Sequence, residues 1–204
     1  MKKISKDTQK KIEQYFLLFV IYSFIGWVME IIIFIILEQR IINRGLLMGP
    51  YCQIYGFGFL IIDFTLRRYK EKPTLLFIMA MIISSVLEYL TSLALEIIFN
   101  VRLWDYTQNF MNLNGRICLQ TTLGFGVLAL IIVYKVNPIL ISKLDKIPEG
   151  ALKYISIIIG VIMILDTCIS YQIIFNIKDT FSKIGDTTSE MSTKVWEAIK
   201  NNEY

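Results

Sequence analysis

Long apolar runs, separated by short polar segments, dominate the chain. Each of five runs approaches the roughly 20 residues that a helix needs to cross the hydrocarbon core of a bilayer. The second run is the shortest, and we expect it to begin within the outer leaflet. The pattern predicts an all-α, polytopic helical membrane protein with about five transmembrane helices, at about Tyr15–Leu37, Cys52–Leu66, Leu75–Phe99, Cys118–Val136 and Tyr154–Ile177.

The apolar runs divide the chain into four regions. Residues 1–14 form a basic N-terminal segment, and residues 15–145 hold the first four spans as a four-helix core. Residues 146–177 hold the fifth span. Residues 178–204 form an amphipathic tail with a helix-capping pattern at Thr187. We expect this tail to lie on the membrane surface or on a partner protein.

Lys and Arg are distributed unevenly between successive polar segments. The segments before span one, after span two and after span four carry five, four and four of them, against two, two and four in the remaining segments. Because cytoplasmic loops carry the excess of Lys and Arg, this distribution predicts a cytoplasmic N-terminus and an outer C-terminus. Only 19% of the 204 residues are charged and 55% are hydrophobic, which agrees with a multi-pass protein of the plasma membrane.

Two pairs of spans resemble one another. Glu30-Ile31-Ile32 recurs as Glu96-Ile97-Ile98, and Cys52 recurs as Cys118. We therefore expect the first four spans to be two repeated helical hairpins. Parallel repeats are related by an axis along the membrane normal, and binding sites often lie between them. In such an arrangement Glu30 and Glu96 would face one another near the outer leaflet.

Carboxylates within the third span form a ladder. Glu88, Ser92 and Glu96 lie four residues apart, along one ridge of the helix. A buried charge costs roughly 2.5–3.5 kcal/mol near a helix centre, so such residues usually have a purpose. The ladder suits a cation or proton path and equally suits interhelical hydrogen bonds. We favour function for Glu88 and packing for Ser92.

The two predicted outer loops contain Arg but no Lys. Arg pairs bidentately with carboxylate or phosphate, so Arg44 and Arg116 are candidate anchors for an anionic group. Simple exclusion of Lys from outer loops explains them equally well, and for Arg40 it is the better explanation. Asp63 lies one turn before Arg67 and is expected to pair with it, whereas Asp166 in the fifth span needs a partner elsewhere in the bundle.

The second outer loop combines Trp, Asp, Asn and Arg more densely than a belt of interfacial aromatic residues requires. Trp104 could close over a bound substrate as a lid. A structural ion-pair network between the helices is an equally good explanation of the charges. The predicted substrate-binding residues are Glu30, Asn43, Arg44, Glu88, Glu96, Trp104, Asp105, Asn112, Asn114 and Arg116.

Several classes of chemistry have no support in the sequence. The chain has no His, and its three Cys residues are far apart, so we expect no metal site and no cofactor. It contains no phosphate-binding loop of the Gly-x-x-x-x-Gly-Lys-Ser/Thr type, and no catalytic constellation is visible. The net charge of +4 is small, and we expect no nucleic-acid partner.

The motifs together resemble a known family. The first hairpin carries Tyr22-Ser23-x-x-Gly26-Trp27-x-x-Glu30 and then Asn43-Arg44-Gly45-x-Leu47-x-Gly49-Pro50-x-Cys52-x-Ile54-Tyr55-Gly56. The second carries Glu88-Tyr89-x-Thr91-Ser92-x-x-x-Glu96, Trp104-Asp105-Tyr106 and Asn112-Leu113-x-Gly115-Arg116-Ile117-Cys118-Leu119. Over about Tyr15 to Lys143 the chain resembles the putative ABC-transporter type IV, or CmpB-like, permeases. Gln53 departs from the pattern, in which Pro is expected.

The resemblance implies the membrane part of an ATP-driven transporter, with the lipid bilayer and a separate ATPase subunit as partners. It brings no assigned substrate and no catalytic residue. The bundle is small for a complete carrier, so we also expect a homo-oligomer. Two other functions remain open: an enzyme that acts on a lipid or cell-wall precursor at the outer leaflet, and an accessory or sensor subunit whose buried charges are structural.

Overall fold

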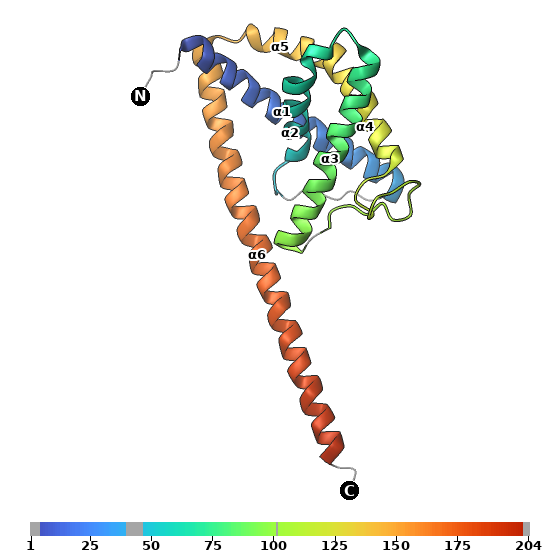
Figure 1. Cartoon of the computed structure of the whole chain (residues 1–204). Helices are drawn as coiled ribbons and strands as arrows, with labels where there is room; N and C mark the ends of the chain where they lie inside the picture. Colours follow the sequence, from blue (N-terminus) through green and yellow to red (C-terminus); the bar gives the residue numbers. More distant parts are fainter. Residues whose placement is uncertain (1–4, 40–46, 101, 202–204) are drawn as a thin grey trace.

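The computed structural model describes residues 5–39, 47–100 and 102–201, with side chains to residue 176 apart from those of 37 and 38. The described residues are mostly helical, and their only bridge of strand type joins Leu113 to Ile117. The elements are α1 (Lys6–Glu38), α2 (Gln53–Leu66), the 3-10 turn η1 (Arg67–Tyr69), α3 (Pro73–Phe99), α4 (Leu119–Ile131), the π-helical turn η2 (Ile132–Val136), α5 (Asn137–Asp145) and α6 (Glu149–Asn201) (Figure 1).

Four helical stretches of the described chain are long and apolar enough to cross a membrane. They cover residues 6–36, 73–99, 119–145 and 149–176. The predicted second span is α2, whose 14 residues extend only about 21 Å at 1.5 Å per residue. It is therefore short for a hydrocarbon core of about 30 Å, as its apolar run indicated. The all-α polytopic membrane fold predicted from the sequence is confirmed.

The third helix shows how these residues suit a bilayer. Its buried side chains recur every four residues and become more polar along the helix: Leu76, Ala80, Ser84, Glu88 and Ser92. Its exposed face carries Ile78, Ile82, Val86 and Leu90. A water-soluble helix has the opposite distribution, with apolar residues inside and polar residues outside. The polar ridge of α3 therefore points into the bundle and its aliphatic face points towards lipid.

The predicted fourth span continues further than its apolar run suggested. The helix passes through η2 into α5 and ends at Asp145, so residues 137–145 form a helix where the sequence suggested a connection. Pro138 follows the π-helical turn, and α5 turns to lie across the end of the bundle (Figure 1). A π turn and a proline both redirect a helix, because each interrupts the regular hydrogen-bond ladder.

Helix α1 packs most extensively against α2, and α3 against α4, which gives two helical hairpins that meet through α2 and α3. Hydrophobic clusters hold the helices together, one around Leu18 and Leu152 and another around Leu66 and Leu76. The start of α1, the α2–α3 turn and α5 lie at one end of the bundle, and the segments at 47–52 and 102–118 lie at the other (Figure 1).

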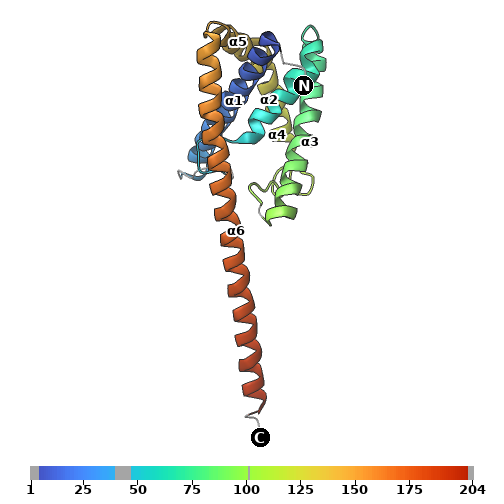
Figure 2. The same cartoon turned by 90° about the vertical axis from the view of Figure 1, so that its left-hand side faces the viewer.

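Helix α6 is much longer than the others. Its 53 residues make a rod of about 80 Å that runs along the bundle and far beyond it (Figure 2). The helix continues through Thr187 without a new start, so the capping pattern there does not begin a separate element. The tail's side chains lie outside the described residues, and its contact with a membrane surface or a partner stays a prediction.

Candidate functional site

The polar ridge of α3 forms one side of the candidate site. Glu88 and Ser92 are 4% and 3% exposed, whereas Glu96, one turn further, is half-buried. The ladder that the sequence predicted therefore runs from the bundle interior towards the end that carries the segments at 47–52 and 102–118. The three side chains of the ladder differ in the groups that they contact.

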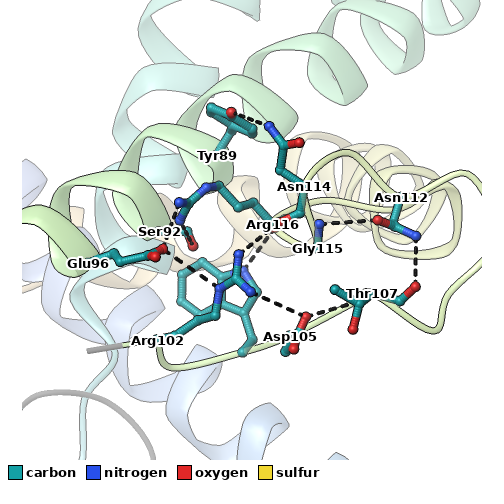
Figure 3. Close-up of polar contacts among 11 residues, drawn as sticks. Tyr89, Ser92, Glu96, Arg102, Asp105, Thr107, Asn112, Asn114, Gly115 and Arg116 are labelled. Carbon is teal, nitrogen blue, oxygen red and sulfur yellow. Dashed lines mark hydrogen bonds and ion pairs between the residues drawn. The ribbon is translucent and has the colours of Figure 1, made fainter. Parts of the chain in front are cut away.

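Arg116 binds two rungs of this ladder at once. Its Nη2 lies 2.6 Å from Oε2 of Glu96, and its Nη1 donates to Oγ of Ser92 at 3.0 Å (Figure 3). The guanidinium also lies beside the ring of Tyr89, 5.7 Å from the ring centroid. The planar fork of Arg suits this geometry, since one guanidinium can direct two N–H groups at acceptors one helical turn apart. Arg116 is only 8% exposed.

The loop before α4 is folded so that Arg116 points inwards. Asn114 and Gly115 both have positive φ, at 54° and 66°, and the side chain of Asn112 accepts from the Gly115 amide at 3.1 Å. A Cβ at Gly115 would lie 2.6 Å from Oδ1 of Asp105. Glycine is therefore needed here for both its backbone conformation and its lack of a side chain.

A second arginine, Arg102, stabilises the loop that carries Arg116. Arg102 donates from Nη2 to the carbonyl of Asn114 at 2.8 Å, and it lies 3.7 Å from Asp105 and 3.8 Å from Glu96 (Figure 3). Trp104 donates from Nε1 to the carbonyl of Arg116 at 2.9 Å. The indole is therefore fixed to the segment that carries Arg116. For Trp104 to act as the predicted lid, it would have to break this hydrogen bond or move together with the segment.

Deeper in the bundle, two carboxylates each accept a hydrogen bond from a tyrosine. Tyr106 donates to Oε1 of Glu88 at 3.1 Å, and Tyr55 donates to Oε1 of Glu30 at 2.5 Å. Burial, followed by the neighbouring carboxyl groups of Glu88 and Glu30, which oppose a phenolate at high pH, raises the pKa of Tyr106 above its ordinary value. Tyr106 therefore remains a hydrogen-bond donor and lies within electrostatic reach of both carboxylates.

The first hairpin positions Tyr55 through a close approach of α1 and α2. A Cβ at Gly26 would lie 2.2 Å from the ring of Tyr55, so only glycine leaves room for that ring. Just before α2, the amide of Cys52 donates to the carbonyl of Ser23 at 2.9 Å. The contacts at Gly26, Ser23 and Cys52 thus position α2 so that the Tyr55 hydroxyl reaches Glu30.

Most of the predicted site residues meet in this region. Glu88, Glu96, Trp104, Asp105, Asn112, Asn114 and Arg116 belong to one connected set of polar contacts between α3 and the 102–118 segment. Glu30 accepts a hydrogen bond from Tyr55 and lies within electrostatic reach of Tyr106, whereas Glu96 pairs with Arg116 and Arg102. Asn43, Arg44 and Arg40 lie outside the described residues.

Sequence reasoning missed four contributors to the site: Tyr55, Tyr89, Tyr106 and Arg102. Tyr89 accepts from the Asn114 side chain at 2.9 Å, and the other three make the contacts given above. A Tyr near a membrane end is usually assigned to the interfacial belt, and this is why Tyr106 was overlooked. The useful signal was its position directly after Asp105, within a dense polar motif.

Two further carboxylates have structural partners. Asp63 accepts from Arg67 at 2.9 Å, as predicted, and also from Tyr15 and Asn137 at 3.0 and 2.9 Å. Asp166 on α6 accepts from the Gly49 amide and the Tyr51 hydroxyl, and so ties α6 to the segment before α2. Burial and then the hydrogen bond to Asp166 raise the pKa of Tyr51, which keeps that hydroxyl protonated.

Comparisons with known proteins give a family and little else. No curated protein and no solved structure matches the chain. One family model, described as "Putative ABC-transporter type IV", matches residues 17–171. The match includes every motif that the site uses, from Gly26 and Glu30 to Arg116, and extends to Asp166 on α6. The chain therefore belongs to the family described as "Putative ABC-transporter type IV".

Proposed function

We propose that this chain is the permease component of an ATP-driven transporter, and that it binds substrate in the polar layer around Arg116 and Glu96. Membership of the family and the four apolar helices support the first part. The sequence carries no phosphate-binding loop, so ATP hydrolysis is assigned to a separate subunit. The second part depends on an asymmetry within the Arg116 ion pair.

The side chain of Arg116 is 10% exposed, but that of its partner Glu96 is 42% exposed. Nη1 of the same guanidinium donates to Ser92. A carboxylate or phosphate group of a substrate can therefore displace Glu96 from Nη2 while Arg116 stays in place. Exchange of one anion for another avoids leaving the buried guanidinium without a partner, which would carry a large free-energy penalty.

The surrounding residues take roles around this exchange. Arg102 would receive the displaced Glu96, because it already lies 3.8 Å from that carboxylate. Asp105 and Asn114 hold Arg102 in position, and Trp104 covers the segment that carries Arg116. Asn43 and Arg44, from the first hairpin, are proposed as further polar contacts to the substrate. The pseudo-symmetric hairpins and an outward-facing site are part of the same proposal.

Native mass spectrometry of the protein, extracted gently from its own membranes, tests the transporter assignment. We expect a co-purifying nucleotide-binding subunit. A homo-oligomer that retains a lipid or cell-wall precursor, with no ATPase, would contradict the assignment and favour an enzyme or carrier at the outer leaflet. The same spectrum reports whether the chain forms the homo-oligomer expected from its size.

Small anions test the site itself. Inorganic phosphate is expected to raise the thermal stability of the protein, at lower concentration in Glu96→Gln and at higher concentration in Arg116→Lys. The first change removes the internal competitor, and the second removes the guanidinium fork. Glu71→Gln is the matched control, because Glu71 is exposed in the α2–α3 turn.

A purely structural role for the network is the second candidate, since Arg116 is satisfied entirely by protein groups. That role predicts that Glu96→Gln and Arg116→Lys lower stability but leave the response to phosphate unchanged. The two candidates therefore make opposite predictions for one titration.

A further inference from the structure

Glu88 has an oxygen with no hydrogen-bond partner. Its Oε1 accepts from Tyr106, whereas its Oε2 is fully buried and accepts no hydrogen bond. The Thr121 hydroxyl interacts with this carboxyl group, but it donates its proton to the Cys118 carbonyl at 3.1 Å. An ionised carboxylate with one oxygen buried in this way would lose hydration without compensation.

The charges that face Glu88 do not compensate for this loss. From α1, Glu30 adds a second negative charge within electrostatic reach. From the 102–118 segment, Tyr106 contributes a neutral hydroxyl group, and the hydroxyl of Tyr55 on α2 is bound to Glu30. Arg116 directs its two described polar side-chain contacts at Ser92 and Glu96, one and two turns away from Glu88 along α3.

We propose that Glu88 is a reversible proton-binding site in the interior of the bundle, and that its resting form is the neutral acid. A proton on Oε2 removes the uncompensated charge and relieves the repulsion from Glu30. The hydroxyl of Tyr106 still donates to Oε1, which becomes the carbonyl oxygen of the acid. This site lies beyond the proposed function, because the protonation of Glu88 does not depend on which substrate is carried or on an ATPase.

The arrangement favours a proton over a metal cation. Hard cations in proteins gather about six or more oxygen ligands. Among the described residues, no group of three or more His, Cys, Asp or Glu side chains lies close enough together to hold a metal ion, so Glu88 lacks the carboxylate partners that such a site would need. A proton needs only the single oxygen that is available.

Infrared spectroscopy of the full-length protein in lipid nanodiscs, with ¹³C-labelled glutamate, tests the proposal. We expect a glutamic-acid C=O band at neutral pH that is lost in Glu88→Gln and retained in Glu71→Gln. The band should disappear in a single step as the pH is raised. Absence of the band at neutral pH, or its persistence in Glu88→Gln, would overturn the proposal.

Two further measurements keep the test decisive if Glu88→Gln fails to fold. Tyr106→Phe removes the donor to Oε1, so the C=O band is expected to move to higher frequency; an unchanged band would refute the assignment to Glu88. Sodium or potassium chloride added at constant pH should leave the band intact. Loss of the band on adding salt would replace the proton site with a cation site.

Discussion

Arg116 and Glu96 form an ion pair, 2.6 Å between Nη2 and Oε2, that fastens the 102–118 segment to α3. The two side chains differ in exposure, and Arg116 contributes a second bond to Ser92. We therefore expect Arg116 to contribute more to stability than Arg102, although both arginines carry the same charge.

Arg116→Gln is expected to lower the free energy of unfolding by about 1–3 kcal/mol, because it removes two charge-assisted hydrogen bonds at a mostly buried position. Arg102→Gln should cost about 1 kcal/mol or less, since its ion pairs are longer and solvent-exposed. Thermal unfolding in detergent compares the two variants directly. Equal losses for both would show that burial of Arg116 is irrelevant.

Gly115→Ala is expected to destabilise the protein by about 1–3 kcal/mol, because alanine must adopt a strained positive φ. The added Cβ would also press on Oδ1 of Asp105. Gly150→Ala is the matched control: nothing lies within 4 Å of its Cβ position, and alanine in a helix is preferred over glycine by up to about 1 kcal/mol. Denaturation midpoints should therefore move in opposite directions. A gain for both variants would contradict the loop geometry.

Asp166→Asn should loosen the segment before α2 from α6, because the carboxylate accepts from both the Gly49 amide and the Tyr51 hydroxyl. The Cys52 thiol is buried in the unaltered protein. In Asp166→Asn it is expected to react faster with a maleimide. Mass spectrometry of labelled peptides measures this rate, with the buried Cys118 thiol as the internal control. Parallel increases at both thiols would indicate general unfolding, and an unchanged Cys52 rate would contradict the proposed tie.

Tyr106 makes stability sensitive to alkaline pH. Its pKa is raised in the folded protein, so the folded state keeps the phenolic proton at a pH where the unfolded state, with an ordinary pKa of 10.0, releases it. Stability is therefore expected to fall as the pH rises above about 10, since the unfolded state then binds fewer protons. Tyr106→Phe should reduce the steepness of this loss in a pH series of unfolding midpoints. An identical slope would exclude Tyr106 as a contributor.

The candidate site could be predicted in part from the chain alone. Helical spacing identified Glu88, Ser92 and Glu96 as one ridge, and the outer loops that contain Arg but no Lys indicated Arg44 and Arg116 as candidate anchors, because both signals are local. The facing of Glu30 and Glu96 across a repeat was a weaker expectation: the described contacts of Glu30 involve Tyr55, and those of Glu96 involve Arg116 and Arg102. The parts played by Tyr55, Tyr89 and Tyr106 depend on approaches between separate segments, which spacing does not encode.

The sequence by itself determined the all-α membrane fold, because apolar run lengths must match the thickness of a bilayer. It also determined that buried carboxylates lie on α3, through a four-residue period. Tertiary structure alone decided which partner each charge receives: Arg116 for Glu96, Tyr106 for Glu88 and the Gly49–Tyr51 segment for Asp166. Those choices follow from loop backbone conformations and close helix packing at Gly115 and Gly26, where an added side chain would collide with a neighbour.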